Sequence, residues 1–585
     1  MDVISVSRAN CKNCYRCVRH CPVKAIKITG GQAEVVESRC LYCGRCVTEC
    51  PQKAKKVRND LEAVKGFIQA GKRVIASIAP SYPAAFDVDS PGEMFDILKS
   101  LGFSGAEETA VGAELVSMEY RRMIKEGQGH PIITTACPVV KNLVEKYHPG
   151  LIGYLAPVVS PMVAHARSLK QRYGRDIKVV FIGPCIAKKA EAQDKSVSGE
   201  VDAVLTFGEL IEWIEKKSDE ILGKSENPEG SREPFIARNY PLPGGLMKTS
   251  SIDEDLLSRE FVVVDGIEDC LELLTALEKG KVSGKLFEML ACRGGCIAGP
   301  SMPPGKSLYE RRQRLLAFID NNRRQVDLKK IEADAIGIDL GRSFEPKIFK
   351  APTPSEAQIR EILSSIGKTT PEEELNCGAC GYPSCRKKAE AVYQGMAELD
   401  MCIPYMRSRA ESLANLIIDH TPNAILLVDG NLNVMEMNRA AEKMLGVKKE
   451  QVQGRPISTV MDDRDFAWVL ANKNNLQEKK VNYPRNSLIT LLTLCYIGVE
   501  NLVLAIIQDI TEQEKQKYEL ARVREETLEK AQEVINKQMR VAQEIAGLLG
   551  ETTAESKMLL LRLMELVKGG GESEGIHGSV RKEPQ

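Results

Sequence analysis

The sequence of 585 residues predicts a multidomain chain that joins α+β, α/β and small helical parts. Three observations predict it: the cysteines stand in clusters, strand-like and helical stretches alternate between residues 60 and 365, and apolar residues recur in heptads around residue 535. At roughly 100–200 residues per domain, this length holds three to five domains. We expect them at residues 1–58, 59–365, 366–407, 408–512 and 513–568, with a disordered tail at 569–585.

The overall charge is balanced. Lys and Arg together number 80, as do Asp and Glu, so the formal net charge at pH 7 is +0. Such a chain has no global field that would attract nucleic acid or an anionic membrane. The N-terminal stretch lacks the pattern of a signal peptide, and the longest apolar run, 488–507, is interrupted by Gly498, Glu500 and Asn501. We therefore expect a cytoplasmic protein that binds neither nucleic acid nor membrane.

The 18 cysteines are the strongest signal in the sequence. Clustered cysteines in a large chain without a secretion signal are typical of metal ligands rather than disulfides. Sixteen of them suit four [4Fe–4S] cubanes, and Cys270 and Cys495 stand alone.

The first domain carries the motif C-x2-C-x2-C-x3-C-P twice, which is the run of bacterial two-cluster ferredoxins, and we expect an α+β ferredoxin-like domain. In that run the fourth cysteine of each motif binds the other cluster. The expected ligands are Cys11, Cys14, Cys17 and Cys50 for one cluster, and Cys40, Cys43, Cys46 and Cys21 for the other. The apolar stretches 25–28 and 33–36 are expected as small strands, and zinc is the alternative metal.

The second domain reads as α/β with parallel strands, among them residues 74–80, 178–184 and 202–208. Its cysteines follow strand-like runs, where open α/β sheets place their ligand sites. Four cysteines from three distant segments can close around a bulky inorganic cluster: Cys137, Cys185, Cys292 and Cys296.

These segments resemble the signatures TSCCP, PCxxKxxE and ExMACxxGCxxG of the [FeFe]-hydrogenases, in the same order. The resemblance covers residues 1 to about 365. It implies an α/β hydrogenase H-domain with an H-cluster, in which those four cysteines hold a cubane and Cys296 also bridges to a diiron unit carrying CO, cyanide and a dithiolate. Lys188 matches a lysine that hydrogen-bonds a cyanide, and Ser160 aligns with a second cyanide contact. The alternative is a domain that keeps only a structural cubane, as in hydrogenase-like proteins of cytosolic iron–sulfur assembly.

Several positions depart from the family pattern. Ala136 stands where catalytic members have a second cysteine that relays protons, and Tyr120, Ala156 and Met123 stand where their relay has Glu, Ser and Glu. Three further positions also differ from the family's usual residue: Leu290, Gly183 and Val140. General acid–base steps typically contribute 10²–10⁴-fold, so we expect slow turnover and a detector rather than a producer of H2.

Residues 366–407 form a third cysteine module, with the spacing C-x2-C-x4-C-x16-C. Its expected ligands are Cys377, Cys380, Cys385 and Cys402, with a helical stretch from Arg386 to Leu399 returning the fourth. It resembles the small helical [4Fe–4S] domain of corrinoid iron–sulfur proteins and electron-transfer complex subunits, and zinc is again the alternative.

Residues 408–512 lack a metal motif. A strand, an Asp-Gly turn and a second strand span 424–434, a helix is expected over 438–445, and strands are expected over 488–497 and 502–508. This order resembles an α+β PAS domain, which is expected to need no cofactor of its own. His420 is expected on the surface and Cys495 in apolar packing.

Residues 513–549 have heptad spacing at Leu528, Ile535, Ala542 and Leu549, with Met539 and Ala546 between them. This pattern predicts a parallel coiled coil and hence a homodimer, with a lone amphipathic helix as the alternative. A second apolar helix is expected over 558–567. Because the sequence holds no kinase, phosphatase or DNA-reading motif, any output requires an effector on another chain, such as a phosphatase or kinase.

Three functions follow from these observations. The first is an H2 or redox sensor of the sensory [FeFe]-hydrogenase type with low turnover of H2 to protons and electrons. The second is a catalytic hydrogenase that exchanges electrons with ferredoxin or another redox protein. The third is an assembly scaffold without diiron, which Cys296 and Lys188 oppose.

Overall fold

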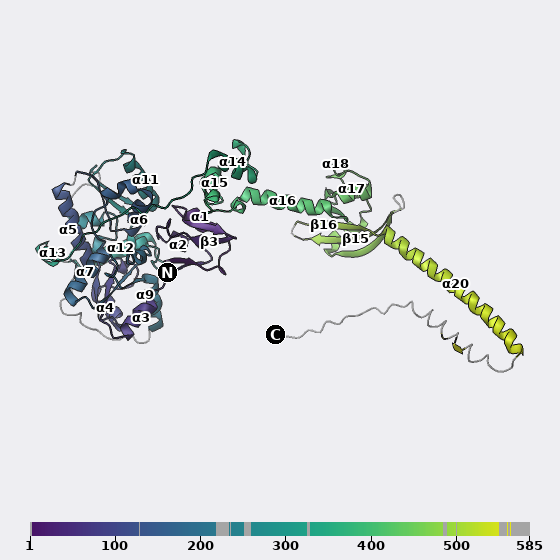
Figure 1. Ribbon diagram of the computed structural model, residues 1–585, viewed down its shortest axis with the longest axis horizontal. Helices are drawn as coiled ribbons and strands as arrows, with labels where there is room; N and C mark the ends of the chain where they lie inside the picture. Colours follow the sequence, from purple (N-terminus) through teal and green to yellow (C-terminus); the bar gives the residue numbers. More distant parts are fainter. Residues whose placement is uncertain are drawn as a thin grey trace. The chain divides into compact units, whose positions relative to one another are not determined.

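The computed structural model describes residues 3–127, 129–217, 233–234, 236–250, 259–323, 328–483, 488–498, 500–548, 558–559 and 562. The chain divides into two compact units, Met1–Arg407 and Ser408–Gln585 (Figure 1). The first unit carries every clustered cysteine, and the second carries Cys495. None of the helices among the described residues combines the length and apolar character that crossing a bilayer requires.

The N-terminal part of the first unit consists of two similar halves. Its strands are β1 (Ile4–Val6), β2 (Ile26–Thr29), β3 (Gln32–Val35) and β4 (Lys55–Val57), and its helices are α1 (Arg16–His20) and α2 (Arg45–Thr48). β1 pairs antiparallel with β4, and β2 with β3, so the two predicted small strands are confirmed. Ile4, Val18, Ile26 and Ile28 are buried in a common core.

The α/β part contains two parallel sheets, and the predicted strands at 74–80, 178–184 and 202–208 are confirmed in the larger one. That sheet has the order β6-β5-β8-β9, with β5 (Val74–Ile78), β6 (Gly105–Glu108), β8 (Lys178–Gly183) and β9 (Ala203–Thr206). The smaller sheet has the order β10-β11-β7, with β7 (Ile132–Ile133), β10 (Phe261–Asp265) and β11 (Leu286–Leu290). β5 and β11 are buried along their whole length, as expected for parallel strands that are covered on both faces.

Helices pack on both sheets. They are α3 (Leu61–Gln69), α4 (Pro91–Ser100), α5 (Ala110–Glu126), α6 (Pro138–Tyr147), α7 (Pro161–Tyr173), α8 (Ala187–Glu191), α9 (Phe207–Lys217), α10 (Gly245–Thr249), α11 (Ile267–Glu278), α12 (Leu308–Asn321) and α13 (Leu328–Ala335). α5 and α7 lie in close contact, since a Cβ on Gly112 of α5 would lie 2.3 Å from the carbonyl oxygen of Pro161. Only a glycine allows the two helices to approach this closely.

The third cysteine module is helical, as predicted, but its central helix is shorter. α14 (Glu356–Ser365) packs on α15 (Cys385–Tyr393), and a short 3₁₀ turn at Leu399–Met401 leads to Cys402. The helix predicted to reach Leu399 ends at Tyr393, because Gly395 adopts a φ of 66° that an α-helix cannot continue through.

The second unit contains a five-stranded antiparallel sheet with the order β13-β12-β16-β15-β14. The strands are β12 (Ala424–Val428), β13 (Val434–Met437), β14 (Leu476–Tyr483), β15 (Leu488–Ile497) and β16 (Leu502–Asp509), and the helices are α17 (Arg439–Leu445), α18 (Lys449–Val452) and α19 (Arg464–Asn472). The strands predicted over 424–434, 488–497 and 502–508 are therefore present. Asn438 caps α17 as its side chain accepts from the amide of Ala441 at 2.9 Å.

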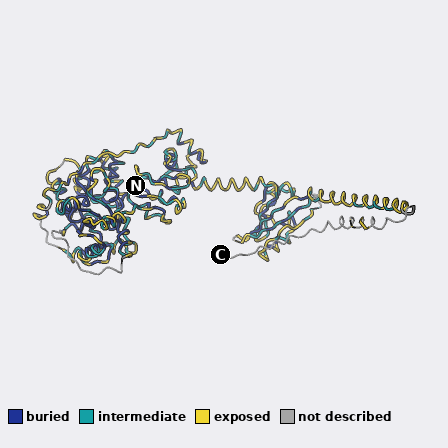
Figure 2. Tube along the Cα trace, turned by 60° about the horizontal axis from the view of Figure 1, so that its bottom comes forward, coloured by how far each residue is buried: buried dark blue, intermediate teal, exposed yellow. Residues whose placement is uncertain are grey.

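Two longer helices flank this sheet in sequence, α16 (Ile403–His420) and α20 (Thr511–Leu548). Figure 2 shows α20 as mainly exposed along its described length. Leu528, Ile535 and Met539 of the predicted heptads are half-buried, and Ala542 is exposed. Leu549, most of the helix predicted over 558–567 and the tail predicted to be disordered lie outside the described residues, and pairing with a second chain stays a prediction.

Candidate functional site

Strands from both parallel sheets end at one cavity of about 110 Å³. Cys185 follows β8, Cys292 follows β11, and Cys137 follows β7 and begins α6 as its N-terminal cap. All four predicted cysteines line this cavity, with Cys296 next to Gly295 in the loop after β11. The carboxyl ends of parallel strands thus bring together thiols that are far apart in the sequence. Cys137 and Cys296 are separated by 159 positions.

Burial and mutual repulsion act strongly on these thiols. Burial raises the pKa of Cys185 to about 11 and that of Cys296 to about 12, and the neighbouring cysteines add to both shifts. Burial also raises the pKa of Cys292 well above its ordinary value. Thiolates that are buried close together require a positively charged group among them to stay ionised, and iron supplies that charge when it binds.

The walls of the cavity are mainly apolar and closely fitted. Gly295 has a φ of 83°, and a Cβ there would lie 2.1 Å from the carbonyl oxygen of Pro241. The amide of Cys296 donates to that same oxygen at 2.7 Å, which fixes the loop that carries the cysteine. Ser81 lines the cavity and is 1% exposed, yet its hydroxyl finds no partner among the described residues. A donor in this position suits a polar ligand of a bound cluster, and so the residues present fit the H-cluster that the sequence implies.

Lys188, at the start of α8, also lines the cavity. Its ammonium donates to Glu191 at 2.7 Å and to the carbonyl oxygen of Ala136 at 3.4 Å. Glu191 is tied in turn to Arg342 at 2.8 Å. Burial opposes ionisation of Glu191, but Lys188 and Arg342 outweigh it and lower the pKa of that carboxyl. The ammonium is therefore held in one place by an ionised partner.

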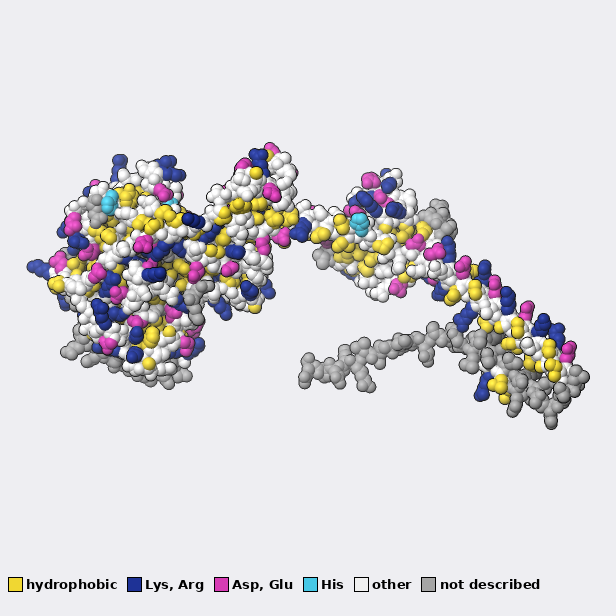
Figure 3. Space-filling view, viewed as in Figure 1, with side chains coloured by type: hydrophobic (Ala, Val, Ile, Leu, Met, Phe, Trp, Pro, Cys, Tyr) yellow, Lys and Arg dark blue, Asp and Glu magenta, His cyan; other side chains and the backbone are white. Residues whose placement is uncertain are grey.

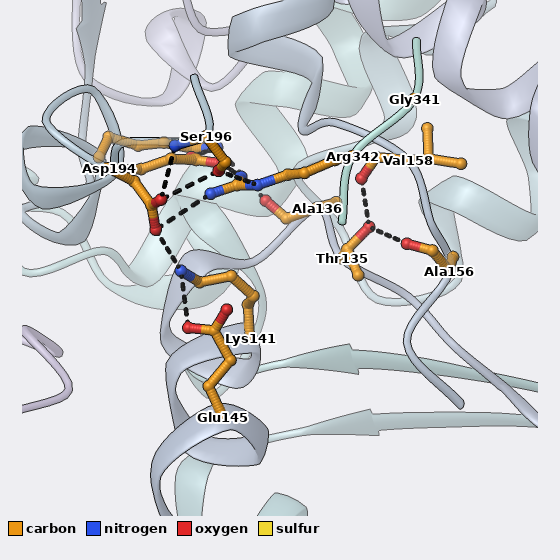
Figure 4. A network of polar contacts seen from close by, with 12 residues as sticks. Thr135, Ala136, Lys141, Glu145, Ala156, Val158, Asp194, Ser196, Gly341 and Arg342 are labelled. Atoms are coloured by element: carbon orange, nitrogen blue, oxygen red, sulfur yellow. Dashed lines mark hydrogen bonds and ion pairs between the residues drawn. The ribbon is translucent and has the colours of Figure 1, made fainter. Parts of the chain in front are cut away.

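Behind Glu191 the ion pairs continue (Figure 4). Arg342 lies 3.3 Å from Asp194, and Asp194 pairs with Lys141 at 3.0 Å and with Lys347 at 2.9 Å. Lys141 also pairs with Glu145 of the same helix at 3.1 Å, and both side chains are 3% exposed. Glu191 belongs to the PCxxKxxE signature and could be found from it, whereas Arg342 stands in a segment without helix or strand that offers no signal.

Ser160 is fully buried directly before Pro161, which lines the cavity, but Ser160 is not itself among the lining residues. Its hydroxyl has no partner among the described residues. Its expected contact with a cyanide ligand therefore stays a prediction.

Of the positions that depart from the family's proton relay, Tyr120, Ala156 and Met123 are buried and Ala136 is half-buried. Ala136 lines the cavity, and Ala156 and Met123 are buried and apolar. The hydroxyl of Tyr120 accepts from the amide of Thr135 at 2.9 Å, and burial raises the pKa of Tyr120 to about 12. Thr135 donates onward to the carbonyl oxygen of Val158 at 2.9 Å (Figure 4).

The two ferredoxin-like motifs adopt the crossed arrangement that the sequence predicts. Cys11, Cys14, Cys17 and Cys50 surround one pocket. In the second tetrad, Cys21 acts electrostatically on each of the three cysteines of the other motif, so it lies near them: Cys40, Cys43 and Cys46. Burial raises the pKa of Cys40 to about 11 and that of Cys43 to about 12.

Left-handed residues recur at matching positions of the two motifs. Asn13 and Tyr42 have φ values of 51° and 60°, Tyr15 and Gly44 have 56° and 78°, and Lys24 and Lys53 both have 48°. Such residues turn successive backbone amides to one side, where they can face an anionic cluster. A Cβ on Gly44 would lie 2.6 Å from Pro300 and 2.8 Å from Ile186, so this loop is in direct contact with the α/β part.

The second tetrad adjoins both of its neighbours. Cys43 lines the cavity that holds Cys137 and Cys296. On the other side, Cys21 and Cys380 both raise the pKa of Lys24 against the larger lowering by burial. Cys380 shares a pocket with Cys377, Cys385 and Cys402, so the third module also gathers its four predicted ligands.

The two isolated cysteines lie outside these tetrads. Cys270 is buried and its thiol points to the carbonyl oxygen of Leu290 at 3.6 Å, and Cys495 lies within β15. Among the described residues, no three His, Cys, Asp or Glu side chains form a site for a single metal ion. His420 lies at the end of α16 and is exposed, as predicted.

Family comparisons agree with this architecture part by part. Matching family models describe a 4Fe-4S dicluster domain at residues 3–51, the C-terminal domain of an iron-only hydrogenase large subunit at 72–300, an Fe-S cluster at 373–404 and a PAS fold at 413–510. These models cover the three cysteine-rich parts and the antiparallel sheet of the second unit.

Similar proteins include hydrogenases and iron–sulfur assembly factors. Iron hydrogenase 1 of Clostridium pasteurianum is 26% identical over 306 residues, which are 42% of this chain and 53% of that protein. The periplasmic [Fe] hydrogenase large subunit of Nitratidesulfovibrio vulgaris is 26% identical over 54% of this chain and 89% of its own length. The probable cytosolic Fe-S cluster assembly factor oxy-4 of Caenorhabditis elegans is 24% identical over 40% of this chain and 63% of its own. The chain thus spans about half the length of the clostridial relative.

Among solved structures, a variant of [FeFe]-hydrogenase HydA1 from Chlamydomonas reinhardtii covers 50% of this chain and 100% of its own, with a TM-score of 0.40 and 17% identity. Taken with the cavity and the three cysteine-rich parts, the family matches identify residues 72–300 as the C-terminal domain of an iron-only hydrogenase large subunit, in one chain with a 4Fe-4S dicluster domain, a further Fe-S cluster domain and a PAS fold.

Proposed function

We propose that this chain is a hydrogen sensor of the [FeFe]-hydrogenase type, with low turnover, four [4Fe–4S] clusters and a diiron unit bridged through Cys296. One observation carries the proposal: four cysteines and Lys188 line one cavity, and Ala136 stands at its edge where a proton donor would be needed. The diiron unit, when bound, supplies the chemistry that splits H2 into protons and electrons.

The protein's own residues contribute position and charge. Lys188, fixed by Glu191, presents a charge-assisted donor to the cavity. The hydroxyl of Ser81 presents a second donor, and the apolar walls exclude water. These groups can hold a bound cluster with anionic ligands while Ala136 provides no proton.

Electrons have a continuous set of sites within the first unit. The second tetrad adjoins the cavity through Cys43 and the third module through Cys21. Cys402, the last ligand of that module, directly precedes α16, and α16 leads in sequence to β12 of the PAS fold. A change of charge at this cluster would therefore occur next to α16. Through this helix the signal would reach an effector, a phosphatase or kinase on another chain.

Infrared spectroscopy of anaerobically matured protein tests the proposal. Bands of CO and cyanide should be present and should shift when argon is replaced by H2. Cys296→Ala should lose these bands but keep the iron of the ferredoxin-like clusters, because we assign the bridge to this thiolate alone. Cys380→Ser should keep the bands and abolish the H2 dependence of effector capture.

The alternatives predict other spectra. A parent protein without CO and cyanide bands would leave a scaffold like the assembly factors among its relatives. A parent with the bands and a turnover equal to that of ordinary hydrogenases would support the ferredoxin-dependent catalytic enzyme instead.

A further inference from the structure

A chain of buried polar side chains leaves the cavity between β5 and α7, away from Lys188. Thr109 lines the cavity, and its hydroxyl lies 2.8 Å from Oγ of Ser77. That oxygen lies 2.7 Å from Nδ1 of His165. Nε2 of His165 lies 3.3 Å from Oε2 of Glu107. All four side chains are at most 3% exposed, so the chain is shielded from water along its length.

The fold sets this arrangement. Ser77 of β5 and Glu107 of β6 are register partners in the parallel sheet, so their side chains lie on the same face. His165 comes from α7, which covers that face, and Gly112 of α5 lets α7 approach, since a Cβ there would lie 2.6 Å from the amide nitrogen of His165. Three elements thus converge on one imidazole.

This row of hydrogen-bonded side chains ends near the surface. Glu107 accepts from Nη2 of Arg172 at 2.6 Å and from the hydroxyl of Tyr173 at 3.0 Å, and both of these residues are partly exposed. Burial opposes ionisation of Glu107, but His165 and Arg172 outweigh it and lower its pKa to about 2. Glu107 is therefore an ionised acceptor in the resting state.

An ionised acceptor at one end gives the hydrogen bonds a direction. Because Glu107 can only accept, we assign a proton to Nε2 of His165, which donates to Glu107, and leave Nδ1 unprotonated to face Ser77. Nδ1 then accepts from Ser77, and Ser77 in turn accepts from Thr109. Every donor points from the cavity toward the surface.

The elements packed against His165 support this direction. α5 approaches with Gly112, which has no side chain, and β5 contributes the hydroxyl of Ser77. The only charged residue of β8 is Lys178, which pairs with Asp202 at 2.7 Å. On α7 itself, Arg172 forms an ion pair with Glu107 and so keeps the acceptor end of the chain ionised.

We propose that Thr109, Ser77, His165 and Glu107 carry protons out of the cavity when H2 is oxidised, in place of the relay that Ala136 and Ala156 interrupt. This inference rests on the proposed function. Each H2 gives two protons and two electrons, and the electrons pass through the cysteine tetrads to a one-electron acceptor protein. Each proton enters at Thr109, passes from group to group to Glu107, and leaves Glu107 for bulk water beside the partly exposed Tyr173. Every group accepts one proton and passes one on. Transfer to so weak a base as Glu107 limits the rate, in keeping with slow turnover.

Steady-state H2 oxidation by matured full-length variants tests the relay. Thr109→Val and Ser77→Ala remove one hydroxyl each, and both should lower kcat by about tenfold to hundredfold while the KM for H2 stays unchanged. The double variant should be no slower than the slower single variant, because both hydroxyls belong to the same route and either substitution alone interrupts it. Infrared bands under H2 at equilibrium should match those of the parent.

Two controls separate relay from structure. Thr109→Ser keeps the hydroxyl and should keep the parent rate. His148 is another histidine whose Nδ1 lies 3.0 Å from a glutamate, Glu278, but neither residue belongs to the relay. His148→Gln should therefore also keep the rate, whereas His165→Gln should lower it. Variants of Thr109 and Ser77 with the parent rate would overturn the relay, as would an equal loss in Thr109→Ser. A parent without H2-dependent bands would instead defeat the proposed function and the relay with it.

A readout without turnover completes the test. ¹⁵N spectra of histidine-labelled full-length protein, with the resonance of His165 identified by its loss in His165→Gln, should show the neutral ring protonated at Nε2. Protonation at Nδ1 would reverse the donor direction and overturn the proposed route, whatever the state of the diiron unit.

Discussion

The two units of the chain differ in the charged side chains that they bury. The first unit buries ion pairs such as Arg342–Glu191 and Lys141–Glu145. In the described part of the second unit no charged side chain is buried, and Asn438 and Thr490 are the buried polar residues there. Large apolar side chains are instead exposed on its helices, among them Leu413, Ile417, Val534 and Ile545.

This difference indicates where each unit does its work. Buried charge costs stability unless it is paired, so the buried ion pairs of the first unit, together with its cysteine-lined cavity, indicate chemistry inside that unit. Exposed apolar residues that recur along helices indicate contacts outside the second unit. Figure 3 shows basic and acidic side chains interspersed on the visible surface of both units, so charge alone does not distinguish them there.

The largest effect should come from breaking the buried ion pairs. Arg342→Met removes from Glu191 and Asp194 a guanidinium whose side chain is 2% exposed, and should cost the first unit about 3–5 kcal/mol in the free energy of unfolding. The two tryptophans, Trp213 and Trp468, lie one in each unit, so denaturant unfolding followed by fluorescence reports on both.

Arg464→Met is the matched control in the second unit. Arg464 is 87% exposed beside Asp462, so its loss should leave the free energy of unfolding nearly unchanged. Equal losses for the two variants would erase the distinction between the units.

The next effect concerns pH. Burial raises the pKa of Glu288 from its ordinary 4.5 to about 7. Hydrogen bonds from backbone amides at α10 lower this pKa but do not outweigh burial. A raised carboxyl pKa stabilises the folded state fully below pH 4.5, and this contribution is lost as pH rises through about 7. At about 1.4 kcal/mol per pKa unit, the loss is about 3.5 kcal/mol.

Glu288→Gln should remove this dependence between pH 5 and 7, as measured by unfolding of the first unit at each pH. The second unit of the same protein serves as the internal reference, because the described residues there bury no carboxyl. An unchanged slope in the variant would show that Glu288 does not titrate in this range.

A third, smaller effect belongs to the surface of the second unit. Ile535→Asp places a charge in the predicted seam of α20, where each fully buried residue would contribute roughly 1.5–3 kcal/mol, and should split the dimer without unfolding the sheet. Val534→Asp, at a neighbouring position that is 58% exposed, should leave the dimer intact. Light scattering after size exclusion measures both, and a monomeric parent would contradict the coiled coil.

The smallest effect is expected for Ala136→Cys. A thiol beside the cavity restores one member of the family's relay, but Tyr120, Ala156 and Met123 still interrupt it. The rate of proton reduction should therefore rise by less than about tenfold. A single variant as fast as ordinary hydrogenases would locate the whole defect at residue 136.

Local patterns in the sequence predicted the cysteine groups well, because ligand spacing is written within short motifs. The crossed tetrads and the third module follow from such spacing, and the strands of the PAS fold from apolar runs. The helix predicted to reach Leu399 was wrong because one glycine with a positive φ ended it at Tyr393.

Contacts between distant segments could not be predicted in this way. Arg342 reaches Glu191 from a stretch without helix or strand, and His165 meets Ser77 only because two strands pair in register beneath α7. The division of the parallel strands into two sheets likewise depends on pairing across the chain, which no local period encodes.

Gly44 sets a constraint on the order of biosynthesis. The loop that carries it contacts Pro300, which leaves the ribosome 256 residues later. At a rate of synthesis of about 5–20 residues per second, roughly 13 to 50 s pass between the synthesis of the Gly44 loop and that of the surface that it contacts. During that interval the face of the module that later contacts Pro300 is uncovered.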